Sequence, residues 1–152
     1  MIIRSMTPDD IGEVKRLLDI CFGESAWSEA SVRSQLEKSD SLCTVAVGDD
    51  CIVGYLAFEV IADEGSVVEL AVHPYHRRQG IARELIQGAL DNCPGMSAVY
   101  LEVRQSNITA ISLYRSLGFE EIGTRRDYYD DPKEDAVIHR LPLVKGAPSA
   151  GG

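Results

Sequence analysis

The chain has 152 residues, 45% of them hydrophobic and 26% charged, which is the length and composition of one folded domain. Fifteen Lys and Arg residues against 24 Asp and Glu give a formal net charge of −9. Because so acidic a surface repels a phosphate backbone, the charge argues against a nucleic-acid-binding protein. We expect a single domain over residues 1–144 and a disordered tail over residues 145–152, which are mostly small.

The sequence contains neither a membrane-spanning segment nor a secretory signal at its first residues. The longest apolar runs, such as residues 67–72 with Glu69 inside, fall far short of the ~20 residues that a bilayer span requires. Residues 1–4 turn polar at once, without the apolar stretch of a secretory signal. We therefore expect a cytoplasmic protein with no membrane partner.

The first half of the chain predicts two helices and then antiparallel strands. Thr7-Pro8-Asp9-Asp10 places a capping hydroxyl, a proline and an acid where they favour a helix start, and this helix should end near Cys21. A second helix should start at Ser28 and end near Glu37. Strands are expected over residues 42–47 and 51–61, joined by a hairpin at Gly48-Asp49-Asp50, and again over residues 67–72.

The second half alternates helices with strands. Apolar residues at helical spacing predict helices over residues 79–93 and 107–117, the second closed by Gly118. Strands are expected over residues 99–104, 119–124 and 134–141. Antiparallel strands followed by strands that alternate with helices indicate an α/β (α+β) domain, with one central mixed β-sheet covered by helices on both faces.

An arginine-rich turn lies between the strand at 67–72 and the next helix. In Arg77-Arg78-Gln79-Gly80-Ile81-Ala82, free backbone N–H groups and the helix dipole favour an anion, and Gly80 permits close approach to the main chain. Together with Arg83, the turn therefore predicts a phosphate site. The alternative is a solvated helix start whose arginines meet nearby acids. Walker and Rossmann phosphate motifs are absent from the sequence, and the pair His73 and His76 has no adjacent carboxylate, so we expect no metal site.

Two further residues are candidates for proton transfer. Period-two alternation over residues 99–104 places Glu102 in the middle of a strand, where a carboxylate is costly unless it is paired or faces a cleft. Glu102 could therefore act as a general base, or it could form an ion pair with Arg104 or another basic residue. Tyr114 belongs to the apolar stripe of the helix at 107–117, and an aromatic residue there is most often part of the core.

These segments together resemble the GNAT N-acetyltransferases over nearly the whole domain. The family's turn pattern, Q/R-x-x-G-x-G/A, is met by Arg77, Gly80 and Ala82, the last as a permitted variant. Three further segments make the sequence similar to the bacterial RimI-type ribosomal-protein-alanine N-acetyltransferases: Trp27-Ser28-Glu29, Arg125-Arg126-Asp127-Tyr128-Tyr129 and Glu134-Asp135-Ala136. The segments that carry the family resemblance are residues 68–74, 77–82, 101–104 and 107–119.

The resemblance implies a GNAT fold in which acetyl-CoA enters a V-shaped cleft between the strand ending at Val72 and the strand of Glu102. It assigns Glu102 as general base and Tyr114 as general acid. It also implies an acceptor site bordered by Trp27, Tyr128 and Tyr129. The residues implied to contact acetyl-CoA are Leu70, Ala71, Val72, Arg77, Arg78, Gln79, Gly80, Ile81, Ala82, Arg83 and Asn107.

The implied reaction transfers the acetyl group of acetyl-CoA to the N-terminal α-amine of a protein, with an N-terminal alanine of a small-subunit ribosomal protein as the leading acceptor. The net charge of −9 would help to attract such a basic partner. A small-molecule amine is the alternative acceptor. An alternative of another class is a non-catalytic acyl-CoA sensor, which would keep the arginine turn without the acid and base. The acidic residues of the segment 127–135 are either a solvated loop or a rim that steers basic peptides.

Overall fold

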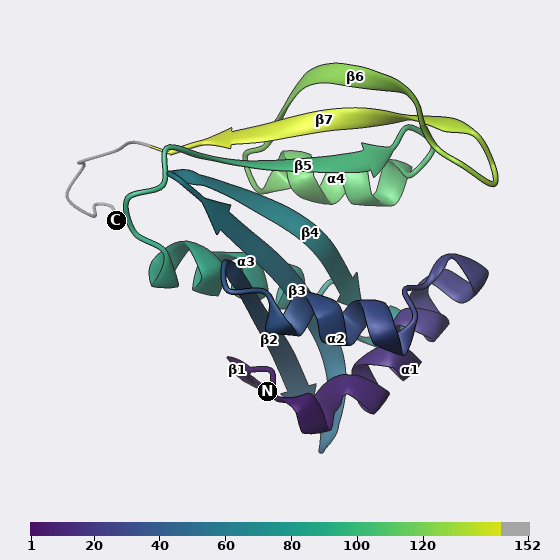
Figure 1. The fold of residues 1–152 in the computed structure, drawn as a ribbon, viewed down its shortest axis with the longest axis vertical. Helices are drawn as coiled ribbons and strands as arrows, with labels where there is room; N and C mark the ends of the chain where they lie inside the picture. The colour runs from purple at the N-terminus through teal and green to yellow at the C-terminus, as the bar shows by residue number, and fades with distance from the viewer. Residues whose placement is uncertain (144–152) are drawn as a thin grey trace. The chain divides into compact units, whose positions relative to one another are not determined.

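The computed structural model describes residues 1–143, so the tail predicted over residues 145–152 lies outside the described part (Figure 1). Seven strands are hydrogen-bonded in the order β1-β2-β3-β4-β5-β7-β6. The elements are β1 (Ile2–Ser5), α1 (Ile11–Phe22), α2 (Glu29–Glu37), β2 (Ser41–Gly48), β3 (Cys51–Ile61), β4 (Glu64–Val72), α3 (Ile81–Asn92), β5 (Ala98–Arg104), α4 (Ile108–Ser116), β6 (Glu120–Tyr129) and β7 (Glu134–Pro142), with short 3-10 turns η1 (Pro8–Asp10), η2 (Gly23–Ser25) and η3 (Pro74–His76).

The predicted mixed sheet is confirmed, since β4 pairs with β5 in parallel whereas the pairs β1–β2, β2–β3, β5–β7 and β6–β7 are antiparallel. The predicted order of elements was wrong at its start, because β1 precedes the first helix. β1 has four residues and exists through its pairing with β2, from Ile2 opposite Val47 to Ser5 opposite Thr44. A strand this short has no periodicity of its own to detect.

β6 also differs from the prediction, because it continues to Tyr129 and does not end at residue 124. Its far end pairs with β7, where Tyr129 lies opposite Glu134. The predicted hairpin between β2 and β3 is confirmed, and Asp49 and Asp50 take positive φ angles of 54° and 64° at its tip. Asp tolerates this left-handed conformation better than most residues, as a tight hairpin requires.

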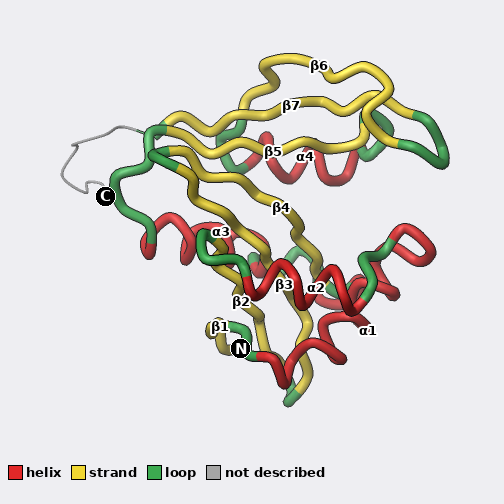
Figure 2. The backbone as a smooth tube through the Cα atoms, in the orientation of Figure 1, coloured by secondary structure: helices red, strands yellow, loops and turns green. Residues whose placement is uncertain are grey.

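The described residues form two compact units: residues 1–61 with 67–94, and residues 62–66 with those from 95 onward. A single domain over residues 1–144 stays a prediction. In the first unit, α1 and α2 cover one face of the strands and α3 covers the other (Figure 2). Val14, Leu18 and Val32 of the two helices pack with Val45 and Tyr55 in a core with no solvent exposure. No helix within residues 1–143 is long and apolar enough to cross a membrane.

A glycine sets how closely α3 approaches the sheet. A Cβ added to Gly54 in β3 would lie 2.9 Å from Ile81 Cγ2 and 3.2 Å from Leu85 Cδ1. Both side chains are buried at 0–2% exposure, so neither can move into solvent. The close packing of α3, which carries the arginine turn at its N-terminus, therefore depends on the absence of a side chain at position 54.

We expect Gly54→Ala to lower the free energy of unfolding by about 1–3 kcal/mol, because the added methyl overpacks the contact between β3 and α3. Gly88→Ala in α3 is the matched control, since a Cβ there meets nothing within 4 Å. It should raise stability by about 0.5–1 kcal/mol through helix propensity. Urea unfolding of both variants measures the difference, and a neutral Gly54→Ala would contradict the packing argument.

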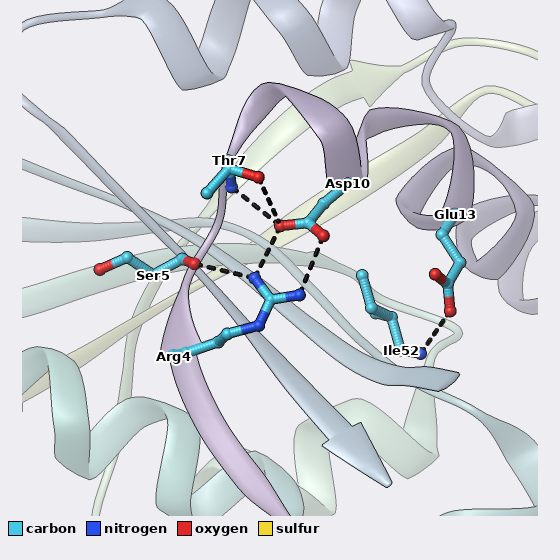
Figure 3. A network of polar contacts seen from close by, with 6 residues as sticks. All are labelled: Arg4, Ser5, Thr7, Asp10, Glu13 and Ile52. Atoms are coloured by element: carbon cyan, nitrogen blue, oxygen red, sulfur yellow. Dashed lines mark hydrogen bonds and ion pairs between the residues drawn. The ribbon is translucent and has the colours of Figure 1, made fainter. Parts of the chain in front are cut away.

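The start of α1 is held by a salt bridge that joins it to β1 (Figure 3). Arg4 donates from Nη1 to Asp10 Oδ2 at 2.8 Å and from Nη2 to Oδ1 at 3.0 Å, and the Thr7 N–H donates to the same carboxylate at 2.8 Å. The Arg4 guanidinium lowers the pKa of Asp10 to about 2. One turn later, Glu13 accepts the Ile52 N–H at 2.6 Å and ties α1 to β3. Thr7 caps the η1 turn as predicted, and this turn runs directly into α1, which begins at Ile11.

In the second unit, β5 pairs with the first residues of β4 on one side and with β7 on the other, and β6 forms the edge. The helix α4 packs on one face through Tyr114, which contacts Phe119 and His139. Since Leu101 lies opposite His139, residues 99, 101 and 103 of β5 share that face. Glu102 therefore points to the face of the sheet away from α4.

Candidate active site

The predicted phosphate turn leads directly into α3. Gly80 is the N-cap of this helix of 12 residues and has φ +79°, a left-handed conformation that favours glycine. A Cβ on Gly80 would meet nothing within 4 Å, so the space beside the main chain is open. Ile81 and Ala82 are buried at 2% and 8% exposure, which leaves only their N–H groups for a ligand. Arg78, Gln79 and Arg83 have exposed side chains. The turn can therefore receive an anion.

Arg77 has a structural contact that the sequence did not predict. Its Nε donates to the carbonyl of Val72 at 3.1 Å. The Cys21 thiol lies 3.5 Å from the same oxygen. Arg77 thus holds the turn against the end of β4, in addition to any contact with a phosphate.

The end of β4 contains the three residues predicted to meet the acetyl-pantetheine arm. Leu70 and Val72 are partly exposed, whereas Ala71 is 3% exposed and packs in the core. The Leu70 N–H donates to Glu69 Oε1 at 3.2 Å. Burial raises the pKa of Glu69 to about 7. Sequence reasoning gave Glu69 no role, although a carboxylate inside an otherwise apolar strand was a signal that could have singled it out.

We expect Glu69→Gln to stabilise the protein above neutral pH. A carboxyl whose pKa rises from about 4.5 in the unfolded chain to about 7 in the fold binds more protons in the native state, so stability falls as pH rises between these values. The neutral amide removes this loss, which amounts to about 3 kcal/mol at pH 8. Urea unfolding at pH 5 and pH 8 measures it, with Glu64→Gln at an exposed position of β4 as control. Parallel pH profiles for Glu69→Gln and the wild type would contradict the assignment.

In the second unit, Glu102 forms an ion pair with Arg125 of β6. Arg125 Nε lies 3.0 Å from Glu102 Oε2, and the side chains are 58% and 27% exposed. Oε2 is buried and receives no hydrogen bond of good geometry, so the Arg125 N–H does not point at the oxygen. The ion pair that the sequence allowed for Glu102 is therefore present, with Arg125 as the partner.

Arg104 is engaged elsewhere. It donates to Glu134 Oε1 at 3.2 Å and to the carbonyls of Pro132 and Asp130 at 2.9 and 3.1 Å. Its guanidinium also lies 4.5 Å from the centre of the Tyr129 ring. One arginine of β5 thus fixes the hairpin between β6 and β7, which carries both tyrosines predicted to border the acceptor site.

Part of the acidic segment 127–135 is used inside the fold. Glu134 accepts the Ser106 N–H at 2.6 Å. Hydrogen bonding by the side chain and backbone of Ser106, together with the Arg104 guanidinium, lowers the pKa of Glu134. Asp135 Oδ1 accepts the Asp127 N–H at 2.8 Å. Glu134 and Asp135 therefore stabilise the β6–β7 hairpin through hydrogen bonds and do not belong to a freely solvated loop.

Tyr114, the predicted general acid, is 8% exposed. Its ring centre lies 5.6 Å from that of Phe119 at an interplanar angle of 69°, and 6.4 Å from that of His139. His139 is 1% exposed, and its Nε2 lies 4.0 Å from Glu121 Oε1. Because Tyr114 packs on the α4 face and Glu102 points to the other, the two side chains approach β5 from opposite faces.

The remaining predicted residues have local roles. Asn107 Oδ1 accepts the Ala110 N–H at 3.1 Å as the N-cap of α4. Trp27 is half-buried against the core of α1 and α2 and lines a shallow hollow of about 400 Å³ with residues of α2. Tyr128 is 48% exposed and packs edge-on against Tyr129.

His73 caps the η3 turn by accepting the Tyr75 N–H. Residues 1–143 contain no group of three or more side chains suited to a metal.

Comparison with known proteins decides the family. The model described as "Acetyltransferase (GNAT) family" matches residues 11–119, most of the chain. The chain belongs to the GNAT acetyltransferase family. The crystal structure of the ribosomal-protein-S18-alanine N-acetyltransferase from Escherichia coli superposes with a TM-score of 0.85 at 31% identity, and the alignment covers 97% of this chain and 96% of that one.

Two curated relatives of this GNAT chain are similar in sequence. The protein ML0378 of Mycobacterium leprae is 37% identical over 145 residues, which are 92% of this chain and 40% of that protein. The [ribosomal protein bS18]-alanine N-acetyltransferase of Escherichia coli K12 is 44% identical over 89 residues, 56% of this chain and 60% of that enzyme. The chain thus spans less than two thirds of the length of either relative in these alignments.

Proposed function

We propose that this GNAT chain transfers the acetyl group of acetyl-CoA to the N-terminal α-amine of a protein, with an N-terminal alanine of a small-subunit ribosomal protein as the leading acceptor. The observation that carries the proposal is the likeness to the S18-alanine N-acetyltransferase, which extends over almost the whole of both chains. The net charge of −9 favours encounter with a basic protein.

The turn at Gly80 suits the pyrophosphate of a coenzyme A thioester. It combines an open approach to the main chain, the N-terminus of α3 and the exposed side chains of Arg78 and Arg83. The N–H groups of Ile81 and Ala82 would bind the phosphates, since their side chains are buried. Main-chain groups of Leu70 and Val72 would then hold the acetyl-pantetheine arm. Asn107 would contact the cofactor with the part of its amide that does not cap α4.

The chemistry needs three proton transfers. An α-amine with a pKa of about 8 is mostly protonated at neutral pH, so Glu102 must accept a proton, directly or through water, before the nitrogen attacks the thioester carbonyl. A main-chain N–H near Val72 would stabilise the tetrahedral oxyanion. The carbon–sulfur bond then breaks, Tyr114 gives its proton to the CoA thiolate, and the second proton that the nitrogen must lose restores the Tyr114 hydroxyl.

We expect Tyr114→Phe to slow acetyl transfer by about 10²-fold, the low end for a general acid, because a thiolate is a good leaving group. The ring contacts with Phe119 and His139 remain, so stability should change little. The basic limb of the pH profile should flatten. Tyr75→Phe, at a residue 88% exposed, is the control. If a folded Tyr114→Phe enzyme transfers acetyl groups at the wild-type rate, Tyr114 serves only in packing and is not the general acid.

Intact-mass analysis tests the proposed acceptor. A basic peptide that begins with alanine should gain one acetyl group, in preference to polyamines and free amino acids supplied at equal concentration. Lysine ε-amines should react more slowly, since their pKa of about 10.4 leaves fewer of them unprotonated. Preference for the small amines would establish the small-molecule enzyme instead. Acetyl-CoA binding without transfer to any amine would establish the sensor.

A further inference from the structure

Two arginines lie on the same face of the second unit but differ in how firmly they are held. Arg104 of β5 and Arg125 of β6 both lie opposite Ala136 of β7, one on each side. Arg104 has three hydrogen-bond acceptors and a tyrosine ring around it. Arg125 is 58% exposed, and it contacts Glu102 and the ring of Tyr128, whose centre lies 5.4 Å from its guanidinium carbon. Arg125 is thus the less constrained of the two.

The pair of Glu102 and Arg125 crosses β7. The residue between the two arginine positions is Ala136, whose small side chain leaves room for the guanidinium to reach over the strand toward β5. The contact is short, at 3.0 Å, yet the N–H does not point at Oε2. An exposed cation held without a directed hydrogen bond is easily replaced by another cation.

The two other arginines on this face already have partners. Arg140 Nε donates to the Tyr100 hydroxyl at 3.2 Å, and Arg104 pairs with Glu134. Glu102 lies between these pairs along β5, with Ile138 opposite it on β7. Within the described residues, Arg125 is therefore the cation that the fold presents to the Glu102 carboxylate.

We propose that Arg125 occupies the subsite of the acceptor amine in the free enzyme and that the acceptor's α-ammonium displaces it from Glu102. This inference rests on the proposed role of Glu102 as the base. A guanidinium stays charged at any working pH, so it can neutralise the carboxylate but cannot be deprotonated by it. The displaced side chain can keep its existing contact with the face of the Tyr128 ring. Arg125 therefore selects for acceptors whose ammonium competes well for Glu102.

Kinetics with matched variants tests the proposal. Arg125→Gln should lower the KM for the peptide by about 2- to 5-fold, the fold-change that matches an exposed ion pair, and leave kcat nearly unchanged. Arg125→Lys should restore most of the wild-type KM, because it returns a cation. Arg126→Gln removes the same charge from the adjacent exposed residue and should leave KM unchanged. A KM that is unchanged or raised in a folded Arg125→Gln enzyme would overturn the proposal.

A second measurement does not depend on turnover. The Nε–H resonance of Arg125, assigned in the wild-type enzyme, should move on addition of peptide and CoA toward its position in the Glu102→Gln variant. A resonance that stays in place at saturating peptide would overturn the proposal. Failure of the proposed function looks different, because the wild-type enzyme would then acetylate no peptide. If it instead acetylates a polyamine, the same resonance measured with that amine decides the role of Arg125.

Discussion

Replacing Glu102 by glutamine is expected to lower kcat/KM for the peptide acceptor by about 10²–10⁴-fold, the range for loss of a general base. Glutamine keeps the size of the side chain and its place in β5, but it cannot accept the proton of the attacking ammonium. The acidic limb of the pH profile should weaken for the same reason. Affinity for CoA should hardly change, because the predicted phosphate contacts lie on the turn before α3.

Glu120→Gln is the matched control, since Glu120 is an exposed carboxylate on β6 of the same unit. Its kcat/KM should equal that of the wild type. A folded Glu102→Gln enzyme with near-normal turnover and an unaltered acidic limb would make Glu102 a structural partner of Arg125. The next candidate would then be Glu69, a carboxyl with a pKa of about 7 beside Leu70.

Gly80→Val is expected to weaken CoA binding by about 10²–10⁴-fold. The valine side chain would enter the open space beside the turn, and it is strained at φ +79°. Loss of two hydrogen bonds to a charged phosphate, at about 1.5–3 kcal/mol each, corresponds to two to four decades of affinity. Titration calorimetry with CoA measures the change.

The control separates backbone strain from the loss of the ligand site. Gly95 has φ +90°, and a Cβ there also meets nothing within 4 Å. Gly95→Val should therefore cost similar stability but leave the affinity for CoA unchanged. Unchanged CoA affinity in a folded Gly80→Val protein would show that the phosphate site lies elsewhere.

Features that depend on neighbouring residues were predictable from the sequence. The helix starts at Thr7, Ser28 and Asn107 depend on side chains that bond N–H groups within three residues. The hairpin at Gly48-Asp49-Asp50 and the left-handed glycine before α3 are equally local. The mixed sheet followed from the order of these elements, because the period of the apolar residues separates strands from helices.

Features that depend on residues distant in the chain emerged only in the tertiary structure. β1 exists because β2 pairs with it about 40 positions later, and a four-residue segment has no pattern of its own. The partner of Glu102 is Arg125 and not nearby Arg104, because pairing of β6 and β7 brings the distant arginine across Ala136 while the hairpin engages the near one. The pKa of Glu69 is likewise decided by what buries it. The sequence thus determined which residues carry charge and where the chain turns, whereas strand pairing and burial decided which charges meet, since electrostatic energies depend on distance and solvent in three dimensions.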